Sequence, residues 1–197
     1  MLYSVLINGL RGWGSGGRRR YVAHFFADDI AMIAASAEET REMLGVLEEY
    51  CYKWRFEVNT KKSQVMVCGC EEEELAQERF VFGGKELSKV EEYKYLGVIV
   101  TADGKWKHNI ARLLSKGRQN LGRLKGFLLR QEQVSVAAKW EVWKALVASG
   151  LRYGAEVWWL DKLEERKFER LQLESIKCML GVSKCTTSSF VRGEVGA

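Results

Sequence analysis

Hydrophobic positions along this chain change their spacing once, close to Thr101. Before that residue, short apolar runs alternate with polar or glycine-containing turns, which is typical of β-strands. After it, apolar residues recur every three or four positions, which indicates amphipathic helices. The pattern therefore predicts an α+β fold in two parts. We expect a mixed part over residues 1–101, a helical part over residues 102–182 and a truncated polar tail over residues 183–197.

The mixed part contains a turn with two adjacent carboxylates. Residues 21–26 and 30–34 are apolar runs that predict strands, and the Asp28-Asp29 pair falls between them. We therefore expect a β-hairpin whose tip carries acidic groups. Residues 2–10 form a further apolar run with no cap before it, and we interpret this run as the end of a helix.

A helix and more strands are expected after this hairpin. Ser36 and Glu39 have the spacing of a capping box, so a helix begins here and extends to about Trp54. Gly83-Gly84 suits a tight turn, because glycine tolerates positive φ. The apolar stripe of the helix contains Met43, Leu44, Leu47 and Cys51. The expected strands cover residues 64–68, 80–82 and 93–100.

Three helices are expected in the second part. The first begins near Lys107, and the third opens at the capping box of Asp161 and Glu164 and ends at Gly181. The second covers residues 134–148 and is broken by Gly150. The apolar face of the first helix holds Ile110, Leu113, Leu114, Gly117, Leu121, Leu124 and Leu128. The apolar face of the second holds Ala137, Ala138, Val142 and Leu146.

Positive charge is concentrated in the helical part. The whole chain has a formal net charge of +5, but residues 103–152 contain eleven Lys or Arg and three acidic residues. This excess indicates a polyanionic partner, and a solvated helical face explains it equally well. No apolar run approaches the length of a membrane span and no signal peptide is evident, so we expect an intracellular protein without a membrane partner.

The Asp28-Asp29 pair is the strongest candidate for chemistry. The chain has only four aspartates, and these two lie between apolar strands. Adjacent carboxylates repel each other unless a cation neutralises them, and Mg²⁺ prefers such hard oxygen ligands. Two such ions about 4 Å apart support nucleotidyl transfer. The alternative is an ordinary surface turn, in which aspartate is common.

The residues around the pair resemble a known family. Phe26-Ala27-Asp28-Asp29 between apolar strands resembles the F/Y-A-D-D hairpin of reverse transcriptases of the non-LTR (LINE) type. The order of the later motifs agrees with this resemblance over nearly the whole chain. These motifs are Asn59-x-x-Lys62-Ser63, Tyr95-Leu96-Gly97 and the L-x-Y-G-x-E-x-W element over residues 151–158.

The resemblance implies a partial polymerase palm, an antiparallel sheet with a helix, followed by an all-helical thumb. Residues 2–10 then correspond to the tail of the template-binding palm helix. It further implies an RNA-directed DNA polymerase that uses two Mg²⁺ (or Mn²⁺) ions, an RNA template, a DNA primer and dNTPs, in the nucleus or cytoplasm of a eukaryotic host. The family places a third metal-binding aspartate and the fingers upstream of this segment, so we expect no polymerisation by the isolated chain.

The resemblance also assigns roles to residues. Asp28 and Asp29 are expected to bind metal, and Lys62, or its neighbour Lys61, to act near the pyrophosphate. A solvated loop lysine is an equal alternative. Tyr95, Leu96 and Gly97 are expected to contact the primer, with Leu96 as plain core the alternative. Phosphate contacts are expected from Arg112, Lys116, Arg123 and Lys125, and helix packing from Trp140, Trp143, Trp158 and Trp159.

Two other interpretations remain open from the sequence. In the first, the chain is a catalytically inactive nucleic-acid-binding remnant of a retroelement. In the second, it is a piece that does not fold alone. Binding to RNA/DNA hybrid without metal, with a steep dependence on salt, favours the first. Cooperative unfolding excludes the second.

Overall fold

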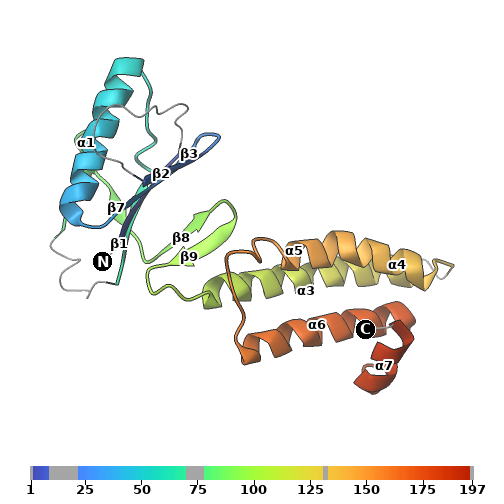
Figure 1. The fold of residues 1–197 in the computed structure, drawn as a ribbon. Coiled ribbons are helices and arrows are strands. Elements are labelled where there is room, and N and C mark those ends of the chain that lie inside the picture. Colours follow the sequence, from blue (N-terminus) through green and yellow to red (C-terminus); the bar gives the residue numbers. More distant parts are fainter. Residues whose placement is uncertain (1, 9–21, 70–77, 131–132, 196–197) are drawn as a thin grey trace. The chain divides into compact units, whose positions relative to one another are not determined.

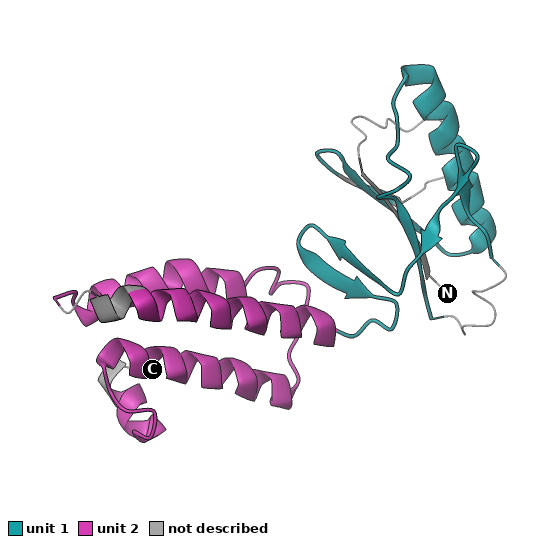
Figure 2. Ribbon diagram, turned by 180° about the vertical axis from the view of Figure 1, so that it is seen from behind, with its two compact units in different colours: residues 1–105 teal, residues 106–197 magenta. Residues whose placement is uncertain are grey.

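The computed structural model describes residues 2–8, 22–69, 78–130 and 133–195. The chain divides into two units, residues 1–105 and residues 106–197, which Figure 2 shows in teal and magenta. The first unit contains the β-strands and one long helix, and the second is entirely helical where it is described. The fold is therefore of the mixed helix and sheet kind.

A five-stranded sheet forms the centre of the first unit (Figure 1). Its strands lie in the order β2-β3-β1-β4-β7. β1 runs antiparallel to both β3 and β4, whereas β7 runs parallel to β4. The bounds are Leu2–Asn8 for β1, Val22–Phe26 for β2, Asp29–Ala34 for β3, Gln64–Cys68 for β4 and Ser88–Lys89 for β7.

The expectation of a helix at residues 2–10 is wrong, because Leu2–Asn8 forms strand β1 in the middle of the sheet. A central strand is bonded on both sides and is commonly a continuous apolar run, which by its pattern alone resembles a buried helix. Register pairs Val5 with both Met32 on β3 and Val65 on β4. Residues 9 and 10 of the predicted helix lie outside the described residues.

Helix α1 (Ala37–Trp54) packs against the sheet (Figure 1). The predicted start is confirmed, since the Ser36 side chain accepts from the Glu39 amide at 3.1 Å. The Glu39 carboxylate, however, accepts from the amide of Ala35, one residue before the expected partner. The predicted stripe of α1 is buried and joins a core that includes Ile30, Met32, Val65, Phe80 and Leu87.

Two small hairpins complete the first unit. β5 (Val81–Phe82) and β6 (Lys85–Glu86) flank the predicted glycine turn, in which Gly83 and Gly84 have φ of 58° and 70°. β8 (Glu92–Tyr95) and β9 (Val98–Thr101) are joined by Leu96 and Gly97, with φ of 46° and 85°. Both hairpins therefore have two-residue turns with positive φ, which match the twist of the strands.

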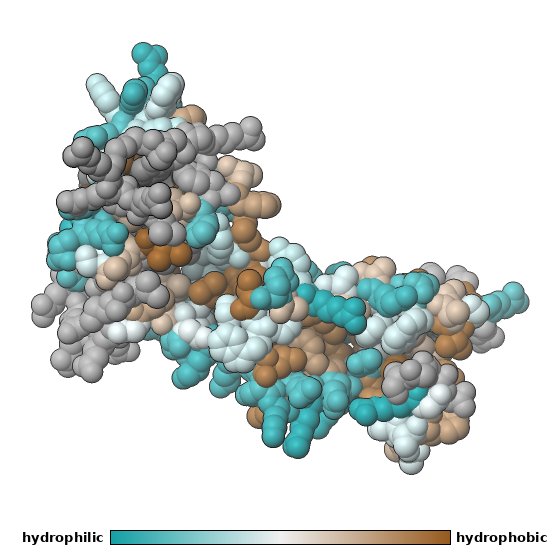
Figure 3. All heavy atoms as spheres, in the orientation of Figure 1, coloured by the Kyte–Doolittle hydropathy of each residue, from teal (hydrophilic) through white to brown (hydrophobic). Residues whose placement is uncertain are grey.

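Three long helical elements form the second unit. α3 (Lys107–Arg130) and α6 (Lys162–Leu180) contact each other, and α4 (Val136–Trp143) continues through a π-helical segment η1 (Lys144–Ala148) into α5 (Ser149–Leu151). We call residues 136–151 the rod. Figure 3 shows hydrophobic side chains gathered between the helices of this unit and hydrophilic ones on their outer faces. The box of Asp161 and Glu164 and the left-handed cap at Gly181 are confirmed for α6.

Two expectations for the rod are wrong. Gly150 does not break the helix, which continues to Leu151. The buried face is also different, because Trp143, Val147 and Leu151 are buried while Leu146 is 49 % exposed. Ala137 and Ala138 are exposed as well. The π segment accounts for the shift, since each π turn holds more residues than an α turn and moves the inward face to positions four apart.

Close packing in the second unit centres on Gly117 of α3. A Cβ atom at Gly117 would lie 2.7 Å from a methyl of Leu151 and 2.9 Å from a methyl of Leu171. Glycine at this position therefore lets α3 approach both the rod and α6. The described part of the predicted polar tail contains a helix, α7 (Ser188–Val195), which buries Val191 completely next to α6.

Among the helices of the described residues, none combines the length and the apolar character that a membrane span requires.

Candidate active site

The predicted hairpin forms as expected, with the two carboxylates at its tip. Phe26 pairs with Asp29 at the last rung of the β2–β3 ladder, and Ala27 and Asp28 form the turn. Asp28 is exposed and Asp29 is half-buried. Ala27 has φ of 53°, in the left-handed region that a side chain disfavours. The turn therefore keeps an unfavourable backbone conformation beside the two acids.

The backbone of Asp29 is held from both sides. β3 lies between β2 and β1, and Asp29 pairs with Phe26 on one side and with Asn8 on the other. A residue in an inner strand loses backbone freedom that a residue in a surface loop would keep. The first acidic position, Asp28, projects from the turn, whereas the second is fixed in the sheet.

Two tyrosines of the β8–β9 hairpin lie within electrostatic reach of Asp29. Burial, followed by the charge of Asp29, raises the pKa of Tyr93 above its ordinary value, and the same two causes raise the pKa of Tyr95. Both phenols are half-buried. The hairpin expected to contact a primer is therefore brought toward the acidic tip, although about 60 residues separate them in the chain.

Of this tyrosine pair, only Tyr95 was predicted as a site residue. Tyr93 was missed, yet the sequence contains a signal for it. Alternate residues of a strand point to the same face, so Tyr93 on β8 must accompany Tyr95. The influence of the Tyr95 phenol on the pKa of Tyr93, which it raises, agrees with this shared face.

The segment before β4 approaches the same end of the sheet as Asp29. Gln64, the first residue of β4, pairs with Leu6, which pairs with Ala31 near the start of β3. Because β1 alone separates β3 from β4, the two strands lie about 10 Å apart. The Asn59 carbonyl accepts from the amides of Lys62 and Ser63, so Lys62, which is exposed, lies in a tight turn beside this end.

The basic residues predicted to contact phosphate divide into two groups on α3. Lys116 and Arg123 are exposed on the face opposite the buried leucines, whereas Arg112, at the same helical spacing, is half-buried and its guanidinium group donates to the Asn109 side chain at 3.1 Å. Lys125 lies toward α6 instead, where its ammonium group contacts the Glu174 carboxylate at 2.5 Å. The structure thus gives Lys125 a packing partner within the helical unit, unlike the exposed Lys116 and Arg123.

The four tryptophans expected in helix packing also divide. Trp143 and Trp158 are buried, and Trp140 stacks on Trp143 with ring centroids 4.6 Å apart. Trp159 is 67 % exposed, so the packing expectation is wrong for most of this side chain. Its ring contacts only the edge of Trp106 among the aromatic pairs of the described residues.

The two remaining aspartates have structural partners. Asp103 accepts from the Thr101 hydroxyl at 2.6 Å and from the Lys105 amide at 2.9 Å, and these bonds lower its pKa. Asp161 caps α6. Within the described part of the chain, no three His, Cys, Asp or Glu side chains form a metal-binding group. Asp28 and Asp29 therefore offer a partial set of ligands.

Comparison with known proteins agrees with the hairpin motif. The family model described as reverse transcriptase (RNA-dependent DNA polymerase) matches residues 4–100. The chain is 27 % identical over 139 residues to "RNA-directed DNA polymerase from mobile element jockey" of Drosophila funebris, an alignment covering 68 % of this chain and 15 % of that protein.

A second relative matches almost the whole chain. It is "Probable RNA-directed DNA polymerase from transposon BS" of Drosophila melanogaster, 23 % identical over 202 residues, which cover 98 % of this chain and 22 % of that protein. The chain thus spans less than a quarter of the length of these relatives. No solved structure matches it significantly.

Proposed function

Residues 4–100 belong to the reverse transcriptase family, of the LINE type that non-LTR retrotransposons encode, and we propose that this chain supplies part of the active site of an RNA-directed DNA polymerase. In this proposal the first unit is the palm and the helical unit is the thumb. The observation that carries the proposal is the hairpin tip. Its two carboxylates lie at one end of a sheet, and the charge of Asp29 reaches Tyr93 and Tyr95.

The donor set at the tip fits magnesium. Asp28 and Asp29 present carboxylate oxygens, which hard divalent cations prefer. Exposure of Asp28 leaves room for further oxygen ligands. We propose that these come from water, from nucleotide phosphates and from a third aspartate of the polymerase, as the family resemblance implies. A bound pair of Mg²⁺ ions supplies activation of the attacking 3′-hydroxyl and stabilisation of the leaving pyrophosphate.

The residues of this chain have distinct tasks in the proposal. Asp28 binds the metal ions from the exposed turn, and Asp29 binds from the sheet, where strands on both sides hold its backbone. Tyr95 and the Leu96-Gly97 turn contact the primer strand, because glycine permits close approach of a backbone. Lys62 approaches the pyrophosphate from the segment before β4.

The helical unit contributes a surface for the template–primer duplex. The exposed Lys116 and Arg123 form a positive row on α3 together with the half-buried Arg112, and such a row binds phosphates without regard to sequence. This row also supports the second candidate function, a nucleic-acid-binding module without catalysis. Asp28 is required for the first function, which is catalytic, and is not required for the second.

Primer extension by a chimera tests the proposal. The chain is joined to the fingers and the upstream palm segment of a related non-LTR reverse transcriptase, and DNA synthesis on an RNA template is measured with Mg²⁺. We expect Asp28→Asn and Asp29→Asn to reduce synthesis to background. Asp103→Asn serves as the matched control, since Asp103 only closes a turn with Thr101 and Lys105. Synthesis that Asp28→Asn leaves unchanged would exclude the catalytic role.

Hybrid binding separates the two candidates. A module that only binds nucleic acid should bind RNA/DNA hybrid equally with and without Mg²⁺, with a steep salt dependence. It should also support no extension in any chimera.

A further inference from the structure

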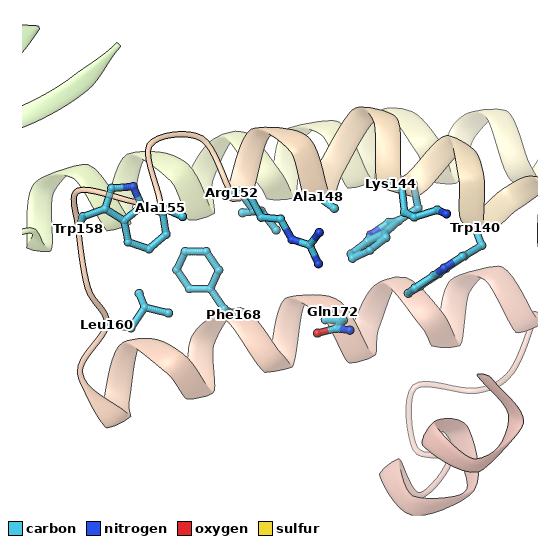
Figure 4. Close-up of a pocket in the computed structure, with 11 residues that line it drawn as sticks. Trp140, Lys144, Ala148, Arg152, Ala155, Trp158, Leu160, Phe168 and Gln172 are labelled. Atoms are coloured by element: carbon cyan, nitrogen blue, oxygen red, sulfur yellow. The ribbon is translucent and has the colours of Figure 1, made fainter. Parts of the chain in front are cut away.

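A cavity of about 270 Å³ lies in the helical unit between the rod and α6. Aromatic side chains line it at both ends, with Trp140 and Trp143 on the rod and Trp158 and Phe168 toward the start of α6. Figure 4 shows Arg152, Trp140 and Gln172 directed into the space between these helices. This rod cavity belongs to neither the acidic tip nor the basic row of α3.

Within the part of the chain that the structure describes, one buried donor at the rod cavity has no acceptor. Trp143 is 5 % exposed, and its indole nitrogen has no hydrogen-bond partner among the described residues. Trp158, which lines the same cavity, donates its indole N–H to the Tyr153 carbonyl at 3.0 Å. Buried donors in proteins are almost always paired, so an unpaired one calls for an acceptor. A ligand in the cavity can provide it.

The positive charge at the cavity is Arg152. Lys144 also lines the cavity, but its ammonium group contacts the Glu141 carboxylate at 2.7 Å. Among the described residues, no carboxylate lies within salt-bridge distance of Arg152, which is exposed. A guanidinium group in this state suits a phosphate, which it binds through two parallel hydrogen bonds. The cavity thus combines flat apolar walls with a guanidinium group that has no carboxylate partner in the described part of the chain.

We propose that the rod cavity binds a single unpaired nucleotide, with its base against Trp140, an acceptor of the base at the Trp143 indole N–H and its phosphate at Arg152. The volume lies just below that of sites for drug-sized ligands, which suits one heterocycle rather than a larger molecule. Nucleobases carry ring nitrogens and carbonyl oxygens that accept hydrogen bonds. The Gln172 amide both donates and accepts, so it can pair with the edge of a base.

The backbone of the rod agrees with a binding role. The π-helical segment η1 contributes Lys144 and Ala148 to the cavity wall. Single π turns cost hydrogen-bond quality and occur frequently at functional sites. Here the π turn places Trp143 and Arg152 on the same wall of the cavity. A regular α-helix of the same length would place these two side chains at a different angle around the helix axis. The proposal rests on the polymerase function only for the source of the nucleotide, an unpaired position in a nucleic-acid strand.

Intrinsic tryptophan fluorescence of the full chain tests the proposal. The chain is titrated with uridine, with uridine monophosphate and with a short single-stranded oligouridylate, all without Mg²⁺. We expect the monophosphate to quench at lower concentration than uridine. Trp143→Phe, which keeps an aromatic side chain but replaces the indole with a smaller phenyl ring and removes the N–H, should weaken binding of both about tenfold, because one buried hydrogen bond is worth about that factor.

Arg152→Gln should remove the advantage of the monophosphate over uridine and leave uridine binding unchanged. Arg170→Gln, at an exposed position of α6 that does not line the cavity, is the matched control and should leave the monophosphate affinity unchanged. Thermal unfolding of each variant confirms that the fold is intact. An oligouridylate that binds tighter than the monophosphate, through the same two residues, identifies a strand as the source; the reverse order identifies a free nucleotide.

If neither Trp143→Phe nor Arg152→Gln changes the quenching, the proposal is wrong. The absence of any quenching would overturn it as well. Displacement of the monophosphate by toluene with equal strength in all variants would show a site for apolar side chains instead. Asp28→Asn should bind uridine monophosphate as the unchanged chain does. Failure of the polymerase proposal is thereby distinguished from failure of this one.

Discussion

Asp29, at the start of β3, lies within electrostatic reach of Tyr93 on β8, and after burial its charge contributes most to the raised pKa of that phenol. The relationship joins two motifs that are distant in the chain. It also provides a measurable signal of the assembled site that needs neither metal nor nucleic acid.

Removing the charge of Asp29 should lower the pKa of both phenols. In Asp29→Asn, burial still raises the pKa of Tyr93 and Tyr95, so each pKa should fall toward its ordinary value of 10.0 without reaching it. Ultraviolet absorbance titration of the tyrosines measures this shift, and Tyr93→Phe and Tyr95→Phe assign it. Asp103→Asn is the control and should leave both phenols unchanged.

The same shift predicts how stability depends on alkaline pH. The folded chain holds the phenolic protons more tightly than the unfolded chain, so this contribution is complete below pH 10.0 and is lost as the pH rises through the raised pKa. The free energy of unfolding should therefore decline less steeply above that pH in Asp29→Asn. Denaturant unfolding at a series of alkaline pH values measures the slopes, and equal slopes would contradict the link.

Neutralising Lys116 should affect nucleic-acid binding, whereas neutralising Lys125 should affect stability. Lys116→Gln should weaken binding to RNA/DNA hybrid and reduce the slope of log affinity against log salt by about 1, with unchanged stability. Lys125→Gln should lower the free energy of unfolding by less than about 1 kcal/mol, since its pair with Glu174 is partly exposed, and should leave the salt slope unchanged. If Lys125→Gln reduced the salt slope and Lys116→Gln did not, the binding face would lie on the side of α6.

Two glycines of α3 should respond in opposite directions to alanine. Gly117→Ala forces a methyl against Leu151 and Leu171 and should lower the free energy of unfolding by about 1–3 kcal/mol. Gly122→Ala meets nothing within 4 Å and should raise it by about 0.5–1 kcal/mol, because alanine favours helix. Chemical denaturation measures both, and stabilisation by both would mean that the helices do not touch at Gly117.

Glycine at the C-terminal cap of α1 should stabilise the folded chain. Arg55 occupies the cap position with φ of 56°, which costs a side chain about 1 kcal/mol, so Arg55→Gly should raise the free energy of unfolding by about that amount. Lys53→Gly, two residues earlier within the helix, should instead lower it by about 1 kcal/mol. Equal effects of the two substitutions would contradict the left-handed cap.

Local patterns predicted the elements that depend on neighbouring residues. The hairpin around Asp28-Asp29 follows from two strand-like runs and a short acidic turn, and α1 and α6 follow from capping residues at Ser36 and Asp161. These signals act over a few residues, so no tertiary contact is needed to recognise them.

Elements that depend on distant partners were missed or assigned wrongly. β1 is a strand because β3 and β4 bond it from both sides, which its own apolar run does not reveal. The end of α1 at Arg55 lacks the usual glycine, and the π turn of the rod has no sequence signature that we recognise. The approach of Tyr93 to Asp29 likewise arises only when the two hairpins assemble.

The π turn gives the rod one residue more than a regular helix would need between its ends. The Ser149 amide donates to the Lys144 carbonyl, five residues earlier, so the surplus residue is absorbed within a single turn. Deleting Ala145, which is exposed, would remove the surplus residue and restore α-helical spacing, so the two halves of the rod would keep their orientation about its axis. Trp143 and Arg152 would then still share a wall, because the π turn compensates for the extra residue between them; in a regular α-helix of the present length they would lie about 100° further apart around the axis.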